Sequence, residues 1–136
     1  MQVSPYLIFE GNAEDVLHFY KEAFGGTITT LSRYSDGPES ADESWNNKIM
    51  HSRLEFDGNL LMISDGYPGY RIPGQGNVQL NVEIETAEKL QDVFAKMSDG
   101  ANVAMPLAKQ FWGATFGMLV DRFGIQWMFN HTPALH

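Results

Sequence analysis

The sequence predicts an α+β fold in which one βαβββ unit occurs twice. Two amphipathic helical patterns begin at Asn12 and at Thr86, which are 74 positions apart. Strand-like runs flank both patterns in the same order, one before the helix and three after it. Residues 66–76 separate the two copies and hold four glycines and two prolines, a composition typical of a linker. At 136 residues the chain has the length of one domain, residues 1–136, containing both units.

The first unit is predicted over residues 1–65. A β-rich run precedes a helix near 12–24, where Asn12 is a typical N-cap residue and Gly25 or Gly26 can end the helix. Asp57-Gly58 predicts a tight hairpin between the last two strands. The four strands are expected at 3–9, 27–34, 49–56 and 60–64.

The second unit is predicted over residues 77–130, and residues 131–136 form a tail. Its helix is expected near 87–98, with Thr86 as the N-cap residue and Gly100 at its end. A turn at 121–124 matches the hairpin of the first unit. The four strands, weaker after the helix, are expected at 78–84, 101–105, 116–120 and 125–129.

A polar segment at residues 35–48 interrupts the first unit and carries a single tryptophan, Trp45. It is either a solvated loop or a lid in which Trp45 closes over a ligand. Its acidic residues are Asp36, Glu39, Asp42 and Glu43.

Composition excludes several classes of function. The chain has 9 Lys and Arg against 17 Asp and Glu, for a formal charge of −8, so a nucleic-acid partner is not expected. The absence of cysteine excludes disulfides, a thiolate zinc site and a cysteine nucleophile. No apolar run approaches the roughly 20 residues of a membrane span, and the first residues lack the basic region of a signal peptide. We therefore expect a cytoplasmic protein without a membrane partner.

Five segments carry a resemblance to a known superfamily. They are Pro5–Phe9, Phe19–Gly25, Leu61–Asp65, Phe111–Gly113 and Phe116–Gly124. With the duplicated unit, they resemble the vicinal oxygen chelate superfamily, which includes glyoxalase I, bleomycin-resistance proteins and extradiol dioxygenases. The details are closest to its PhnB-like branch, often labelled 3-demethylubiquinone methyltransferase-like. The resemblance implies a curled, eight-stranded mixed sheet around a cleft, with helices outside, and a homodimer.

Metal-dependent members of this superfamily place one ligand on the first and last strand of each unit. Aligned on this chain, these positions fall on Pro5, near Gln79, near Met128, and near Met62 or Ser64. Proline and methionine cannot supply the imidazole or carboxylate that a divalent ion prefers. We therefore expect no metal site of the usual kind, and no cofactor.

The methyltransferase label has no support in the residues. Gly74-Gln75-Gly76 precedes a predicted strand, whereas a nucleotide-binding glycine loop follows a strand and opens a helix. The pattern also lacks the parallel sheet of a nucleotide-type cofactor fold.

Alternation along three strands separates a helix-facing set of side chains from a set that faces the cleft. The helix-facing set comprises Ser52, Leu54, Phe56, Leu80, Val82, Ile84, Ile125, Trp127 and Phe129. The cleft-facing set comprises His51, Arg53, Glu55, Gln79, Asn81, Glu83, Gln126, Met128 and Asn130. Alternatively, the second set meets water or another subunit.

His51, Arg53 and Glu55 form the most reactive group in the predicted cleft. His51 could act as a general acid or base, and Arg53 could bind a carboxylate or phosphate. The simpler interpretation is a cross-strand ion pair. A buried Arg53 requires a partner, which Glu55 or Glu83 could supply. We expect no role for His18, on the outer face of its helix, or for His131 and His136 in the tail.

Phe111-Trp112-Gly113 is predicted to be a loop between strands. Trp112 either walls the cleft, or both aromatic rings cap the core or a dimer interface. Four methionines are interpreted as core residues rather than a cofactor site: Met97, Met105, Met118 and Met128.

The predicted function is metal-free binding of a small, anionic or aromatic molecule by a homodimeric protein. Its predicted ligand-binding residues are His51, Arg53, Gln79, Asn81, Trp112 and Gln126. One alternative is an enzyme of the lyase, isomerase or dioxygenase kind, with a rebuilt metal site around His51 and Glu55. Another is a dimeric protein whose role lies in assembly.

Overall fold

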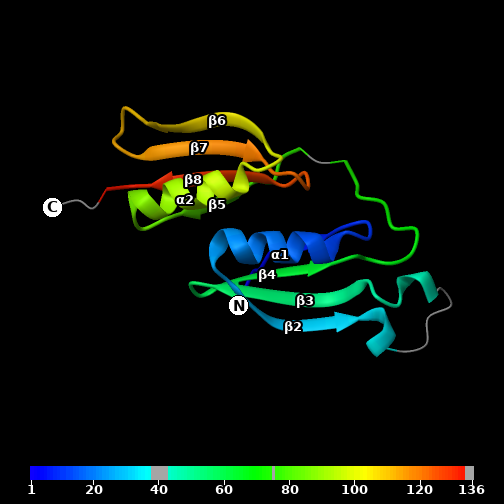
Figure 1. The fold of residues 1–136 in the computed structure, drawn as a ribbon. Coiled ribbons are helices and arrows are strands. Elements are labelled where there is room, and N and C mark those ends of the chain that lie inside the picture. Colours follow the sequence, from blue (N-terminus) through cyan, green and yellow to red (C-terminus); the bar gives the residue numbers. More distant parts are fainter. Residues whose placement is uncertain (38–42, 75, 134–136) are drawn as a thin grey trace. The chain divides into compact units, whose positions relative to one another are not determined.

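The computed structural model describes residues 1–37, 43–74 and 76–133, and it contains the βαβββ order twice (Figure 1). The first copy runs β1 (Tyr6–Ile8), α1 (Ala13–Phe24), β2 (Thr27–Arg33), β3 (Ile49–Phe56) and β4 (Asn59–Ser64). The second runs β5 (Leu80–Glu83), α2 (Ala87–Met97), β6 (Asn102–Lys109), β7 (Thr115–Val120) and β8 (Gln126–His131). Short 3₁₀ turns at Tyr34–Asp36 and Glu43–Trp45 lie between β2 and β3.

The strands form two four-stranded mixed sheets, one in each of two compact units, residues 1–74 and 75–136. The strand orders are β1-β4-β3-β2 and β5-β8-β7-β6. In both sheets the first strand pairs in parallel with the last, and the other pairs are antiparallel. The predicted α+β class and the duplicated unit are confirmed. The described strands form two four-stranded sheets rather than the single eight-stranded sheet that the resemblance implied.

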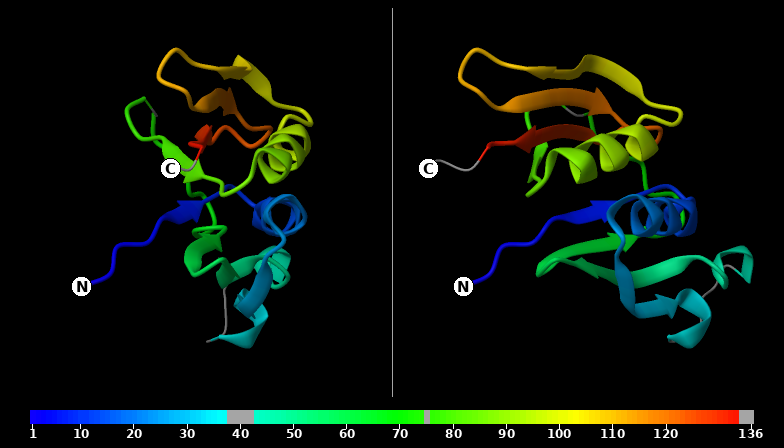
Figure 2. Two further views of the ribbon diagram at one scale, coloured as in Figure 1. Left: turned by 90° about the vertical axis from the view of Figure 1, so that its left-hand side faces the viewer. Right: turned by 60° about the vertical axis from the view of Figure 1, so that its left-hand side comes forward.

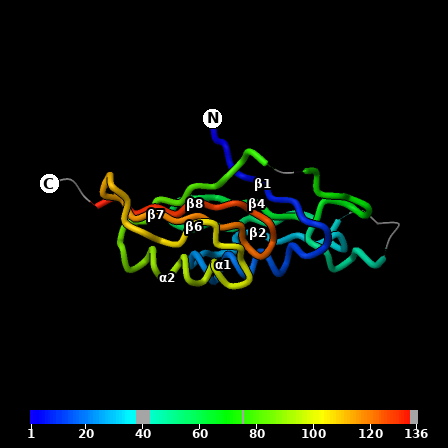
Figure 3. The backbone as a smooth tube through the Cα atoms, turned by 90° about the horizontal axis from the view of Figure 1, so that it is seen from above, coloured from blue at the N-terminus to red at the C-terminus, as the bar shows by residue number. Residues whose placement is uncertain are grey.

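Each helix packs on one face of its own sheet (Figures 2 and 3). Helix α1 lies against β3 and β4, and α2 lies against β8. The buried side of α1 consists of Ala13, Val16, Leu17, Tyr20, Ala23 and Phe24, and that of α2 of Leu90, Val93, Phe94 and Met97. Among the residues that the structure describes, the other face of each sheet carries no α-helix of its own unit. We call it the helix-free face of unit 1 or of unit 2.

The two helices begin in different ways. The Thr86 side chain accepts a hydrogen bond from the Lys89 backbone N–H at 3.1 Å, as its sequence position predicts. The Asn12 side chain makes no cap bond. In its place the buried Asp65 accepts hydrogen bonds from the backbone N–H groups of Ala13 and Ile49, each at 2.8 Å. Asp65 therefore joins the start of α1 to the start of β3.

Several element ends differ from the sequence prediction. Strand β1 begins at Tyr6 rather than residue 3, and β6 continues to Lys109. Strand β6 lies at the sheet edge, where its proline, Pro106, is tolerated because no inner hydrogen bond is lost. His131 is the last residue of β8 rather than a tail residue, and its Nδ1 lies 2.9 Å from the Ile84 carbonyl oxygen. His136 lies outside the described residues.

Within the described residues, neither helix is long and apolar enough to cross a membrane.

Candidate functional site

The helix-free face of unit 1 collects the candidate residues of β3. Ser52 and Leu54 are fully buried on the helix side. His51 and Arg53 alternate with them and are half-buried, and Glu55 is exposed. Because successive side chains of a strand point to opposite faces, these three lie on the helix-free face.

Strand register places a row of four side chains across this face. Tyr6 of β1 pairs with Met62 of β4, Met62 pairs with Arg53 of β3, and Arg53 pairs with Thr30 of β2. His51 pairs with Ser32 on β2 in the same way. Neighbouring strands lie about 4.8 Å apart, so Tyr6 and Arg53 flank Met62 closely.

Tyr6 reaches over β4 to His51. The Tyr6 hydroxyl lies 2.9 Å from His51 Nδ1, and the two ring centroids are 5.7 Å apart with a 40° tilt. Tyr6 is 42% exposed. When Nδ1 accepts a hydrogen bond from the phenol, the imidazole proton sits on Nε2, which can then donate a hydrogen bond to a ligand.

The Arg53 guanidinium forms no hydrogen bond or ion pair with any of the described residues. Glu55 lies two residues further along β3, and the Glu83 carboxylate accepts from the Thr132 backbone N–H at 3.0 Å. Among the described residues no ion pair joins Arg53 to Glu55. Glu83 belongs to unit 2, so its pairing with Arg53 remains a prediction. A half-buried guanidinium tolerates the absence of such a pair because it still reaches water, and it keeps its donors available for an anion.

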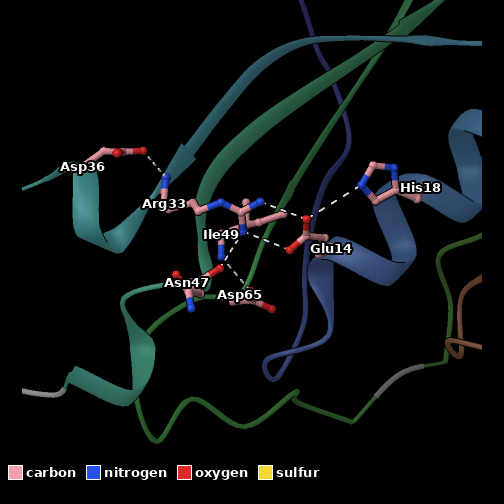
Figure 4. A network of polar contacts seen from close by, with 7 residues as sticks. All are labelled: Glu14, His18, Arg33, Asp36, Asn47, Ile49 and Asp65. Carbon is pink, nitrogen blue, oxygen red and sulfur yellow. Dashed lines mark hydrogen bonds and ion pairs between the residues drawn. The ribbon is translucent and has the colours of Figure 1, made fainter.

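The end of β2 is fixed by a polar network around Arg33 (Figure 4). Its guanidinium donates two hydrogen bonds of 2.9 Å to the Glu14 carboxylate of α1 and one of 2.6 Å to the Asn47 carbonyl. The Arg33 backbone N–H donates to Asp36 at 2.8 Å. The hydrogen bond from Arg33 holds the pKa of Glu14 below its usual value, and the pKa of Arg33 is raised in turn. His18, which is exposed, lies 3.8 Å from Glu14.

This network positions an aromatic pair that follows it in the chain. The ring of Tyr34 meets that of Trp45 edge-on, with centroids 5.6 Å apart. Burial raises the pKa of Tyr34, and the charges of Asp65 and of ionised Tyr6 raise it further. Trp45 therefore packs on Tyr34. Whether residues 35–48 close over a ligand remains a prediction, and Glu39 and Asp42 lie outside the described residues.

The helix-free face of unit 2 has the same geometry and different side chains. Asn81 pairs with Met128, Met128 with Met118, and Met118 with Met105. Met105 is 40% exposed, so its interpretation as a core residue is wrong, whereas Met97 is fully buried. Asn130 donates to Asn81 at 3.4 Å. Gln79 precedes β5, and Gln126 opens β8 opposite Val120.

Phe111 and Trp112 lie in the turn between β6 and β7. Their rings meet edge-on with centroids 4.9 Å apart, and Phe111 and Trp112 are 97% and 57% exposed. A backbone hydrogen bond from Gly113 to Gln110 closes the turn, and Gly113 has a φ of 98° that favours glycine. These rings do not cap the core of unit 2.

The residues do not fit the divalent metal site of the superfamily. Register places Tyr6 opposite Met62 and Asn81 opposite Met128. Pro5 and Gln79, the expected positions, both lie one residue before their strands. Phenol, amide and thioether groups are poor ligands for such an ion. The described part of the chain contains no cluster of three His, Asp or Glu side chains suited to a metal.

The structure thus brings His51 and Arg53 together in unit 1. Gln79, Asn81, Trp112 and Gln126 belong to unit 2, so a pocket common to all six residues remains a prediction. Tyr6 and Tyr34 were missed by the sequence analysis. Alternation within Pro5–Phe9 could have identified Tyr6, because Leu7 is the residue that turns toward the helix side.

A family model described as 3-demethylubiquinone-9 3-methyltransferase matches residues 1–129. The chain belongs to this family. It is 27% identical to protein YjdN of Escherichia coli over 96% of this chain and 95% of that protein. It is 24% identical to an uncharacterized protein of Mycobacterium bovis over 92% of this chain and 79% of that one.

Solved structures agree with this family assignment. Protein PA1353 of Pseudomonas aeruginosa has 38% identity and a TM-score of 0.87, covering 97% of this chain and 98% of that chain. A Bacillus cereus PhnB protein, a putative 3-demethylubiquinone-9 3-methyltransferase, has 28% identity and a TM-score of 0.80, covering 97% and 100%. A glyoxalase/bleomycin resistance protein/dioxygenase family enzyme of Burkholderia phytofirmans has 14% identity and a TM-score of 0.65, covering 94% and 97%, and shares the fold.

Proposed function

We propose that this member of the family binds an anionic small molecule on the helix-free face of unit 1, without a metal ion. The observation that carries the proposal is Arg53, a half-buried guanidinium that no described carboxylate neutralises. A guanidinium binds carboxylate or phosphate through two parallel hydrogen bonds. An incoming anion therefore gains these bonds without first breaking an ion pair.

Further donors surround Arg53 on the same face. Thr30 and Ser32 of β2 pair with Arg53 and His51, and the Tyr6 hydroxyl bonds to His51. Glu55 is the acidic residue of β3 on this face, and it lies at the opposite end of the strand from His51. The anion is therefore expected on Arg53, on the side of its guanidinium away from Glu55.

The alternative enzyme with a metal between His51 and Glu55 is not supported by this geometry. The two residues are four positions apart on one strand, so their Cα atoms are separated by about 13 Å. Metal–nitrogen and metal–oxygen bonds measure roughly 2 Å. Parallel side chains at that separation do not converge on one ion.

Methyl transfer, which the family description names, is likewise not part of our proposal. Each sheet has one parallel and two antiparallel strand pairs. A nucleotide-type cofactor is bound by a doubly wound parallel sheet with a glycine loop at a strand end. Neither unit resembles that arrangement.

We also propose that the protein forms a homodimer. The support is apolar exposure on unit 2, where Phe111, Trp112, Val103 and Met105 are all at least about one third exposed. Sedimentation equilibrium should give a dimer at micromolar concentration. A monomer there would contradict this part of the proposal.

The experiment that tests anion binding compares benzoate with benzamide, which have the same ring and differ in charge. Titrations by isothermal calorimetry at low ionic strength should show benzoate binding and a loss of at least tenfold for benzamide. Arg53→Gln should abolish the difference. Arg122→Gln, the same charge change on an exposed arginine of unit 2, is the matched control and should preserve it. Equal affinity for the two probes would reject the proposal, and a stoichiometric divalent metal in chelator-free protein would reject its metal-free part.

A further inference from the structure

The thioether side chain of Met62 lies between Tyr6 and Arg53 on this surface. Met62 of β4 pairs with Tyr6 on one side and Arg53 on the other, and all three lie on the helix-free face of unit 1. Met62 is half-buried. A methionine sulfur makes favourable contacts with aromatic rings, and its flexible side chain adapts to a flat molecule.

Flat side chains border this thioether. The Tyr6 and His51 rings lie 5.7 Å apart with a 40° tilt, fixed by the hydroxyl bond to Nδ1. His51 and Arg53 are two residues apart on β3, a separation of about 7 Å. That length is close to the span of one six-membered ring and its carboxylate.

A second ring pair lies at the end of β2, beyond Ser32. The ring centroids of Tyr34 and Trp45 are 5.6 Å apart, and the rings meet edge-on. The Arg33–Glu14 bonds hold the strand immediately before this pair. Aromatic rings prefer edge-to-face and offset contacts, which the Tyr6–His51 pair beside Met62 can make with a planar ligand.

From this arrangement we propose that the ligand is an aromatic carboxylate, with its carboxylate on Arg53 and its ring over Met62 beside Tyr6 and His51. The inference rests on the proposed function and deepens it by naming the ligand class. The anion requirement comes from Arg53, whereas the ring requirement comes from Tyr6, His51 and Met62. The two requirements can therefore be tested separately.

The test compares benzoate with cyclohexanecarboxylate, which has the same charge and a saturated ring, and with acetate. Affinities are measured by titration of ¹⁵N-labelled full-length protein followed by NMR chemical shifts. We expect benzoate to bind about fivefold tighter than cyclohexanecarboxylate, the ratio that ~1 kcal/mol of aromatic contact gives. Acetate should bind more weakly than both.

Variants at Tyr6 separate the ring from its hydroxyl. Tyr6→Leu should reduce the benzoate preference toward unity and leave acetate affinity unchanged, whereas Tyr6→Phe should retain the preference. The partial exposure of Tyr6 makes both changes compatible with folding. Met62→Leu should lower the preference modestly, and Met128→Leu, at the corresponding position of unit 2, should not.

Each outcome bears on one of the two proposals. Equal affinities for benzoate and cyclohexanecarboxylate, both lost in Arg53→Gln, would overturn the aromatic inference and keep anion binding. Equal affinities for benzoate and benzamide, both above cyclohexanecarboxylate, would overturn anion binding and keep the aromatic preference. Failure of all the acids to bind would overturn both.

Discussion

The two units share one backbone plan and present different chemistry on their helix-free faces. Met62 and Met128 occupy corresponding places on the last strands, since each pairs with the first strand of its unit. The row in unit 1 is Tyr6, Met62, Arg53 and Thr30, and the matching row in unit 2 is Asn81, Met128, Met118 and Met105. The hydrogen-bonding pattern thus constrains strand order and register, while side chains away from the helix vary freely. The cationic binding site we propose is a property of one unit.

The same comparison extends to how each unit holds its helix. In unit 1 a buried carboxylate from the end of β4 accepts the first N–H of α1, whereas in unit 2 a local threonine caps α2. Unit 2 uses its own buried carboxylate, Asp121, to accept from Phe123, Ile125 and the Trp127 indole within the β7–β8 turn. Equivalent folds are therefore stabilised at different places.

The largest effect is expected for Asp65→Ala. The change leaves the N–H groups of Ala13 and Ile49 without their acceptor inside the protein, which should lower the free energy of unfolding by about 3 kcal/mol. Thr86→Ala, which removes the cap of α2, should cost about 1 kcal/mol. Urea denaturation followed by circular dichroism measures both. Equal losses would show that the two helices depend on their caps alike.

Gly117→Ala tests whether unit 2 can carry a side chain where unit 1 carries Ser52. A Cβ at Gly117 would lie 2.9 Å from both Phe94 Cε2 and Leu107 Cδ2, so the core of unit 2 must shift. We expect the free energy of unfolding to fall by about 2 kcal/mol, measured by thermal denaturation. Gly76→Ala is the control, because a Cβ there meets no atom within 4 Å, and it should leave the stability unchanged in the same measurement.

Arg53→Met gives the row of unit 1 the side chain found in unit 2. Benzoate affinity should fall at least tenfold, or ~1.4 kcal/mol, because the guanidinium is lost. Met118→Leu should leave benzoate affinity unchanged. Calorimetric titration at one fixed ionic strength checks both variants, and a comparable loss in Met118→Leu would move the site to unit 2.

The smallest effect concerns Glu14 in the first turn of α1. Its pKa is lowered in the folded protein, so its contribution to stability is present above the unfolded pKa of roughly 4.3 and is lost as the pH falls through the lower folded value. Because the pair is partly exposed, Glu14→Gln should cost less than about 1 kcal/mol at pH 7. This cost should vanish in strong acid. Denaturation measured from pH 7 into strong acid checks this, and a cost that stays constant over the whole range would contradict it.

Much of the fold could be predicted because its determinants are local. The 3.6-residue period placed α1 and α2 within one residue of their ends, and Asp57-Gly58 located the β3–β4 hairpin. Strand alternation also separated Ser52 and Leu54 from His51 and Arg53. Each of these features depends on residues within one element.

The rest depends on contacts between elements distant in sequence. Opposition of Tyr6 and Met62 requires the parallel register of β1 and β4, which no short pattern contains. The same holds for Asp65, because its place in the sequence does not indicate which backbone N–H groups donate hydrogen bonds to it. The sequence favoured an ion pair for a buried Arg53, whereas the guanidinium is only half-buried and has no such pair among the described residues.

The Asp65 cap also has a consequence for the order of folding. Asp65 lies 52 positions after Ala13 and 16 positions after Ile49 in the sequence. Helix α1 therefore cannot acquire this cap until the chain through β4 has been synthesised and docked. Helix α2 is capped by a residue three positions away and can form early. Since long loops slow the closure of distant contacts, we expect unit 1, although synthesised first, to complete its structure through a slower and more cooperative step than unit 2.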